Sequence, residues 1–179
     1  YRYEYDSLGR LIRSSEYNGG EFTQRTEHIY DESDRLTLQT WYNGSGATSQ
    51  TYAYSDTSGL LTELGTYFPG NPFDATPGAS NTPSLGIAYT YNVLNQVSRK
   101  TISVNGSDFF YNAYWYPAID GNQRSTQIKH FNYRKSSDDG LICGFEYTYD
   151  ARGNIKTVSK TTSGDPQLLE TYTYDGQNQ

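Results

Sequence analysis

Pairs of aromatic residues separated by one residue recur along the whole chain, each of the form aromatic-x-Tyr. The second members of successive pairs are 25, 24, 37, 25, 33 and 25 residues apart. A period of this length indicates a repeat protein, in which each unit packs on its neighbours. Positions i and i+2 share one face of a β-strand, so the spacing predicts an array of strand-forming repeats. The seven pairs are Tyr3/Tyr5, His28/Tyr30, Tyr52/Tyr54, Tyr89/Tyr91, Tyr114/Tyr116, Tyr147/Tyr149 and Tyr172/Tyr174.

A turn signal follows each pair. In the first unit Asp6 comes directly after the second tyrosine, and Gly9 lies three residues later. An Asp side chain there can bond the backbone of the turn, and Gly adopts positive φ freely, which together predict a type I turn closed by a glycine bulge. The Asp position reads Asp6, Asp31, Ser55, Asn92, Pro117, Asp150 and Asp175. The Gly position reads Gly9, Asp34, Gly59, Asn95, Gly121, Gly153 and Asn178, with Gly59 and Gly121 each one residue later than in the other units.

An apolar residue then opens a return strand in five units, whereas the fifth unit has Gln123 at this place. A second turn signal follows at Asn18-Gly19, Asn43-Gly44 and Asn105-Gly106, and more weakly at Ser163-Gly164. Asn-Gly between apolar runs is a strong hairpin signal. The predicted fold is therefore all-β: tandem antiparallel hairpin repeats that form a curved, open sheet over residues 1–179. The two long gaps predict loop insertions at about 65–86 and 133–141.

The composition limits the possible partners. A net charge of -6 argues against binding nucleic acid. Only 34% of residues are apolar, but 16% are aromatic and 19 are Tyr, which favours a half-buried sheet over disorder. No apolar run reaches the roughly 18 residues that span a membrane. Because the chain lacks Met and opens within the repeat pattern, we expect an internal fragment of a larger protein.

The run from Tyr1 to Leu11 (YRYEYDSLGRL), echoed by YTYDARGNI at 147–155, resembles the YD repeat of Rhs proteins, bacterial toxin complexes, wall-associated proteins and teneurins. The resemblance implies a β-strip that winds into a hollow shell, which encloses a C-terminal effector in bacterial members and supports cell-surface recognition in teneurins. It also implies that neighbouring YD repeats are the main partners and that the protein is secreted or displayed on the cell surface. So few repeats are expected to leave open sheet edges, which favour pairing with another copy.

Catalytic and metal-binding roles are disfavoured. The recurrent acids occupy one turn position that Ser55 and Asn92 also fill, which favours a turn-capping role over acid-base chemistry. His28 takes a place that Tyr fills in other units. Two His and one Cys are too few for a zinc site. We therefore expect a non-enzymatic protein without a cofactor or metal.

A binding role remains as an alternative. Trp41 and Trp115, together with exposed tyrosines, offer flat aromatic faces on which a sugar ring or a cell-surface partner can stack. Nothing in the sequence separates a tyrosine that packs on the next hairpin from one that binds a glycan, although the periodic placement favours packing.

Overall fold

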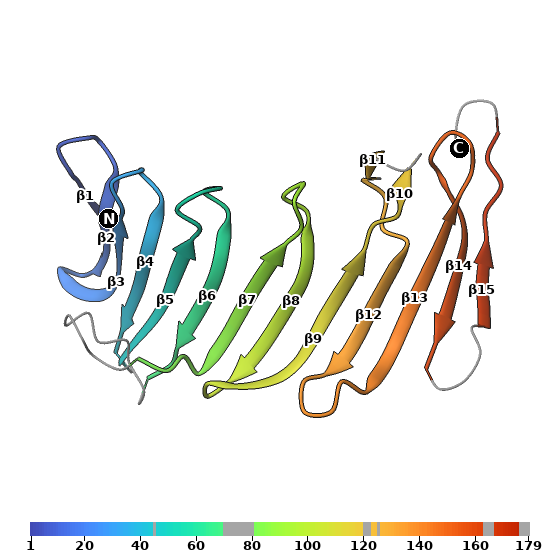
Figure 1. Ribbon diagram of the computed structural model, residues 1–179. Coiled ribbons are helices and arrows are strands. Elements are labelled where there is room, and N and C mark those ends of the chain that lie inside the picture. The colour runs from blue at the N-terminus through green and yellow to red at the C-terminus, as the bar shows by residue number, and fades with distance from the viewer. Residues whose placement is uncertain (45, 70–80, 120–122, 125, 163–166, 176–179) are drawn as a thin grey trace. The chain divides into compact units, whose positions relative to one another are not determined.

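The structure is a computed structural model that describes residues 1–44, 46–69, 81–119, 123–124, 126–162 and 167–175 (Figure 1). All regular secondary structure among these residues is β-strand. None of them belongs to a helix with the length and apolarity needed to cross a membrane. The strands are β1 Arg2–Tyr5, β2 Leu11–Asn18, β3 Glu21–Tyr30, β4 Leu36–Asn43, β5 Gly46–Tyr54, β6 Leu61–Tyr67, β7 Leu85–Tyr91, β8 Val97–Val104, β9 Ser107–Trp115, β10 Ala118–Ile119, β11 Gln123–Arg124, β12 His130–Lys135, β13 Leu141–Tyr149, β14 Ile155–Thr161 and β15 Gln167–Thr171.

Thirteen strands form one antiparallel sheet in chain order, and β10 pairs with β11 in a separate small hairpin (Figure 1). The predicted antiparallel meander of hairpins is confirmed. The chain divides into two compact units, residues 1–88 with 103–107 and residues 89–102 with 108–179.

A register shift precedes the second tyrosine on four of the strands, β1, β3, β5 and β13. In the first unit Tyr5 is opposite Leu11, and the shift lies between Glu4 and Tyr5. The same shift precedes Tyr30 on β3 and Tyr149 on β13. A bulge of this kind adds one residue to one strand and increases the local twist. The turns that follow these four strands therefore begin with the same irregularity in strand pairing.

The second kind of turn is a two-residue connection. Asn105 and Gly106 have φ values of 48° and 78°, which is the pairing that Asn-Gly favours in hairpins. At the first such turn, Asn18 is instead the last strand residue opposite Glu21, and Gly19 and Gly20 form the turn with φ values of 63° and 91°. Asn43 pairs with Gly46, which places Gly44 in the turn. The Ser163-Gly164 signal lies outside the described residues.

The first predicted insertion, 65–86, is too wide at both ends. Gly65 is in β6 and is opposite Gly86 in β7, so both glycines belong to strands. A Cβ atom at Gly65 would lie 2.8 Å from the Thr51 hydroxyl, and close packing across the sheet therefore explains this glycine better than a loop does. Residues 70–80 of the predicted insertion lie outside the described residues.

The second predicted insertion, 133–141, is wrong. Residues 130–135 form β12, residues 141–149 form β13, and the segment between them is the turn of an ordinary hairpin. The extra residues of the fifth repeat lie mainly between Tyr116 and β12, where β10 and β11 pair with each other. Asp138-Asp139-Gly140 resembled a loop because turn residues dominate both loops and hairpin turns.

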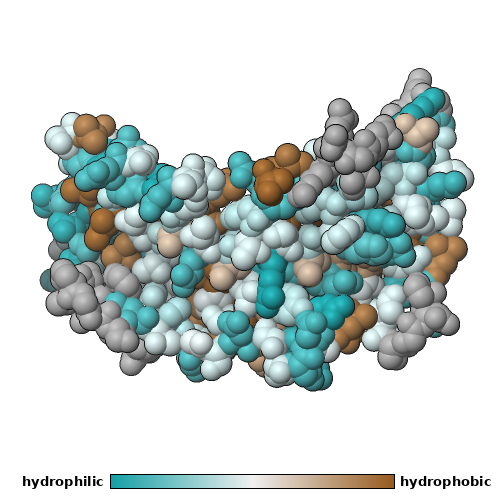
Figure 2. Space-filling view, viewed as in Figure 1, coloured by the Kyte–Doolittle hydropathy of each residue, from teal (hydrophilic) through white to brown (hydrophobic). Residues whose placement is uncertain are grey.

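The sheet has little buried core. Among the described residues, Tyr67 and Tyr111 are the buried large apolar side chains, with exposed fractions of 5% and 8%. On the face shown in Figure 2, strongly hydrophobic residues are scattered among hydrophilic and intermediate ones. Because apolar burial is limited, hydrogen bonds and ring contacts between neighbouring strands carry much of the specificity of the fold.

Candidate functional site

The Asp turn of the first repeat is closed by its own side chain. The Asp6 Oδ1 atom accepts hydrogen bonds from the backbone N–H groups of Leu8 and Arg10, at 2.9 and 3.0 Å. The N–H of Gly9 donates to the Asp6 carbonyl oxygen at 3.0 Å, and Gly9 has a φ of 80°. Asp6 and Gly9 therefore act together as a turn-forming pair.

Three other turns follow this geometry, those that begin at Asp31, Asn92 and Asp150. Asn92 accepts from the N–H groups of Leu94 and Gln96 at 2.9 and 3.1 Å, so an amide oxygen replaces the carboxylate oxygen. Asp175 is exposed, and the residues that follow it lie outside the described part of the chain. Further turns are formed by Asp31 with Asp34 (φ 62°), Asn92 with Asn95 (φ 60°) and Asp150 with Gly153 (φ 90°).

These hydrogen bonds also set the charge state of the turn acids. The backbone N–H of Arg10, followed by its side chain and the N–H of Leu8, lowers the pKa of Asp6 below the ordinary value of 3.8. The pKa values of Asp31 and Asp150 are lowered in the same way, first by the N–H groups of Arg35 and Asn154. A general acid needs a raised pKa, so these carboxylates are poorly suited to that role.

Arginines extend two of the turns toward the next repeat. The Arg10 Nε atom is 2.7 Å from Asp6 Oδ2, and its Nη1 atom is 2.5 Å from Asp34 Oδ1 in the following turn. Its guanidinium also lies over the Tyr30 ring, 4.9 Å from the centroid. Arg35 repeats the arrangement over Tyr54 at 4.7 Å. The arginine directly after the turn glycine or its substitute is the sequence signal that could have revealed this role.

The second tyrosine of a pair joins its repeat to the preceding one. The Tyr30 hydroxyl donates to the carbonyl oxygen of Leu11, the apolar residue that opens the previous return strand. We call this contact the inter-repeat hydrogen bond. It recurs within each unit, with distances from 2.7 to 3.1 Å, as Tyr30 to Leu11, Tyr54 to Leu36, Tyr116 to Val97, Tyr149 to Ile128 and Tyr174 to Ile155.

The inter-repeat hydrogen bond identifies the residue that opens the return strand of the fifth repeat, and this residue is not Gln123. Tyr149 bonds to Ile128 at 2.7 Å, so Ile128 opens the return strand and the fifth repeat does not lack an apolar residue there. Gln123 lies in β11, opposite Ile119. The small hairpin moves the return residue to twelve positions after Tyr116, compared with six positions between Tyr5 and Leu11.

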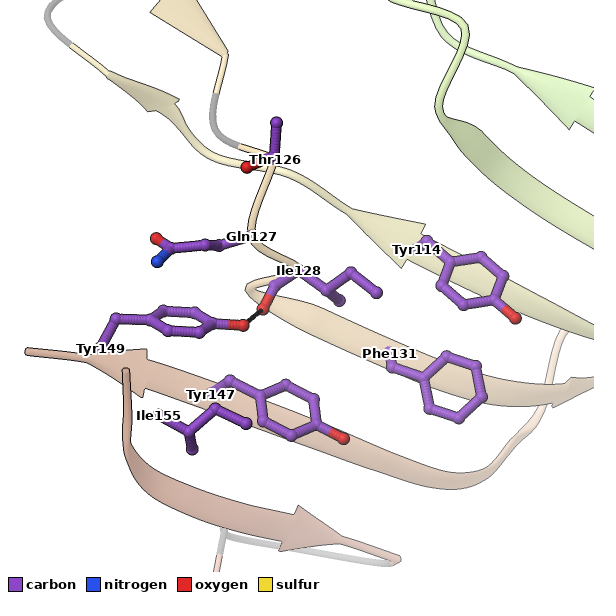
Figure 3. Close-up of a pocket in the computed structure, with 8 residues that line it drawn as sticks. All are labelled: Tyr114, Thr126, Gln127, Ile128, Phe131, Tyr147, Tyr149 and Ile155. Atoms are coloured by element: carbon purple, nitrogen blue, oxygen red, sulfur yellow. Dashed lines mark hydrogen bonds between the residues drawn. The ribbon is translucent and has the colours of Figure 1, made fainter. Parts of the chain in front are cut away.

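An open hollow lies beside this corrected position, within the second unit (Figure 3). Its volume is about 480 Å³. Figure 3 shows the rings of Tyr114, Phe131 and Tyr147 around one space, with Gln127 and Thr126 at the loop that precedes β12. We call it the aromatic hollow; it is lined by Tyr114, Thr126, Gln127, Ile128, Phe131, Tyr147, Tyr149 and Ile155.

The two tryptophans expected to bind glycans are outside the aromatic hollow. Trp41 is half-buried in β4, between Thr26 and Thr48 on the neighbouring strands. Trp115 is 62% exposed on β9, next to Tyr114. Successive residues of a strand point to opposite faces, so Trp115 is directed away from the ring of Tyr114.

His28 is half-buried, and burial lowers its pKa below the ordinary value of 6.5. Its ring is stacked with that of Tyr30, as expected for an aromatic substitute. Within the described ranges, no group of three or more His, Cys, Asp or Glu residues is placed to hold a metal ion.

Known structures share this fold. A chain of the TcdB2-TccC3-Cdc42 complex matches with a TM-score of 0.65 and 18% identity, over 98% of this chain and 8% of that one. A chain of the TcdB2-TccC3 complex matches with a TM-score of 0.63 and 19% identity, over 95% of this chain and 8% of that one. No family model and no curated protein sequence matches. The likeness therefore concerns the fold, and this chain spans 8% of the length of either matched chain.

Proposed function

We propose that this chain is a structural segment of a larger YD-repeat shell, and that it forms part of the wall around an enclosed C-terminal effector. The fold likeness to chains of the TcdB2-TccC3 complexes supports this proposal. A wall needs a continuous sheet rather than a deep core, and the described residues form such a sheet with few buried side chains. We further propose that the protein is secreted or displayed on the cell surface.

The observation that carries the proposal is the repeated inter-repeat hydrogen bond. The tyrosine of each joined pair bonds to the backbone of the preceding repeat. In the first unit Arg10 also pairs with Asp34 of the next turn, and Arg35 lies over the ring of Tyr54 in the next repeat. The residues that recur along the sequence therefore hold neighbouring repeats together. This is the expected design of an array whose stability is spread over its length.

The proposed role is non-catalytic. The turn acids Asp6, Asp31 and Asp150 each accept hydrogen bonds within their own turn, and these bonds lower their pKa values and so favour the ionised form. Ionised acids fixed in separate turns support a capping role.

The partners we propose are further repeats of the parent chain. Tyr3 and Tyr5 on β1 are 54% and 59% exposed, and Leu168 and Leu169 on β15 are 62% and 51% exposed. Both strands are at an end of the strand order, so each has one unpaired edge within the described sheet. An adjoining strand would cover these side chains and complete the backbone hydrogen bonds; a second copy of the chain is the alternative occupant.

A protease-protection assay on the natural full-length polypeptide tests the proposal. We expect the region that follows the repeats to resist digestion as long as the shell is intact. Combining Tyr54→Phe with Tyr149→Phe removes two inter-repeat hydrogen bonds and should speed the digestion of that region. The matched control is Tyr17→Phe, since Tyr17 is exposed on β2 and is not the second tyrosine of a pair. Digestion of the following region at the rate of an unfolded chain, before any substitution, would refute the enclosing role.

A further inference from the structure

We infer that the aromatic hollow of the second unit is a binding site for an uncharged pyranose sugar. The hollow is formed by residues of β9, β12, β13 and β14 and by the loop that precedes β12 (Figure 3). This inference does not depend on the shell function, because a wall segment and a free binding module would present the same site.

Phe131 is the residue that sets this hollow apart from the rest of the array. It lies three residues after Ile128, which opens its return strand. The corresponding positions of the other repeats hold Ser14, Gln39, Leu64, Lys100 and Val158. No other repeat has an aromatic ring here, so the packing of the array does not require one. A large ring that the repeat does not need is a candidate for ligand contact.

The rings form a platform at the hollow. The Phe131 centroid lies 4.9 Å from that of Tyr114, with an angle of 38° between the planes. Tyr147 adds a third ring from β13, and all three are half-buried. A pyranose has a face of C–H groups that packs on an aromatic ring, while its hydroxyl groups point outward to polar partners.

Polar groups at the loop supply such partners. Thr126 is exposed and offers a hydroxyl group. The amide of Gln127 is held in place, since its Nε2 atom donates to the Gly153 carbonyl oxygen at 2.9 Å. A few fixed polar groups beside an apolar lining are the usual composition of a small-molecule site.

The charge of the lining selects the class of ligand. None of the residues that line the hollow is acidic or basic. A charged ligand would therefore leave water without an opposite charge to pair with, which is costly. A purely apolar ligand would bring no polar group to the exposed Thr126 hydroxyl beside the hollow. The volume of about 480 Å³ lies within the range of roughly 300–1000 Å³ found for ligand pockets. An uncharged sugar fits each of these conditions.

The test uses methyl β-D-glucopyranoside and methyl β-D-galactopyranoside as probes, in saturation-transfer NMR titrations against the whole chain. We expect at least one glycoside to bind with a dissociation constant on the order of 1 mM, as befits a small ligand in an open site. D-Glucuronate, its charged counterpart, should bind at least tenfold more weakly. Absence of saturation transfer to both glycosides would overturn the inference.

Two substitutions separate a sugar site from an apolar one, and each introduces the residue type that another repeat carries at the matching position. Phe131→Leu introduces the leucine found at Leu64 and should weaken glycoside binding about tenfold. Gln127→Leu introduces the leucine found at Leu60 and should also weaken it, whereas an apolar ligand would bind more tightly. Phe109→Leu alters an exposed ring outside the hollow and is the matched control, which should leave binding unchanged. Circular dichroism checks that each variant is folded. Glycoside binding that survives Phe131→Leu, or strengthens in Gln127→Leu, would overturn the assignment.

Discussion

The hydroxyl group of Tyr30 donates a hydrogen bond of 3.0 Å to the carbonyl oxygen of Leu11, nineteen residues earlier in the chain. The acceptor is a backbone carbonyl group on the return strand of the preceding repeat. The hydrogen bond therefore depends on where that strand lies and not on which side chain it carries. The same relationship joins Tyr149 to Ile128, where the repeat itself is irregular. The inter-repeat hydrogen bond therefore persists where the turn sequence does not.

Tyr30→Phe should destabilise the chain by about 1 kcal/mol, the usual net contribution of one hydrogen bond. The ring and its packing remain, so the loss reports the hydroxyl group alone. Tyr5→Phe serves as the control and should change the free energy of unfolding by much less. Urea denaturation followed by circular dichroism measures both. Equal effects of the two substitutions would contradict the structural role of the hydrogen bond.

Gly9→Ala should cost about 1 to 2 kcal/mol, because the residue has a φ of 80° and an L side chain is strained there. A Cβ atom at this position would meet nothing within 4 Å, so the cost arises from the backbone and not from a clash. Gly9→Asn should cost less, since Asn95 takes the equivalent place at a φ of 60°. Thermal unfolding of the two variants gives the comparison. Finding Ala no worse than Asn would rule out the strained turn.

Protonation of the turn acids should lower the free energy of unfolding at acidic pH. Because the N–H of Arg35 and its side chain lower the pKa of Asp31 in the folded state, the ionised form binds the turn more strongly. This contribution is complete above the ordinary value of 3.8 and is lost as the pH falls through the lowered folded-state pKa. Asp31→Asn should therefore flatten the dependence of stability on pH below about 4.

The reverse substitution supplies the control for that prediction. Asn92 occupies the same turn position in its own repeat, so Asn92→Asp should introduce an additional acid-sensitive step. Unfolding free energies measured from pH 2 to 7 on both variants test the pair. An unchanged slope in Asp31→Asn would show that this carboxylate does not stabilise the fold.

His28→Tyr should remove a second, milder pH effect. Burial lowers the pKa of His28 below 6.5, so the unfolded chain takes up the proton more readily than the folded one. Stability should therefore fall as the pH drops below about 6.5 and level off below the folded-state pKa. Tyr fills this place in the other repeats and does not titrate there. Chemical denaturation at pH 5 and 7 measures the difference, and a drop that remains in His28→Tyr would assign it to another group.

The regular parts of the fold were predictable because turn chemistry is local. Asp6 and Gly9 indicate a turn from their own side chain and backbone, and the tyrosine pairs indicate strands by their spacing. The inter-repeat hydrogen bond was not predictable in this way, since its acceptor is a carbonyl group that every residue carries. Its position depends on the register between strands that are far apart in the sequence.

The fifth repeat shows where the local signals mislead. Gly121 follows Pro117 at nearly the expected distance, which placed the return strand at Gln123 instead of Ile128. Asp138 and Gly140 then resembled an insertion, although they belong to a hairpin turn. The aromatic hollow was missed for the same reason, because Phe131 stands out only after the return strand has been placed correctly. The sequence identifies Trp41 and Trp115 as flat aromatic rings. Burial and the face of the strand determine which rings line the hollow, and the sequence alone does not give either.

Electron cryomicroscopy of the natural polypeptide that contains this segment tests the central claim most directly. We predict that residues 1–179 form part of a continuous sheet that bounds a closed interior, with adjoining strands paired to the outer edges of β1 and β15. A map in which this sheet stands alone, with no enclosed space and both edges unpaired, would contradict it.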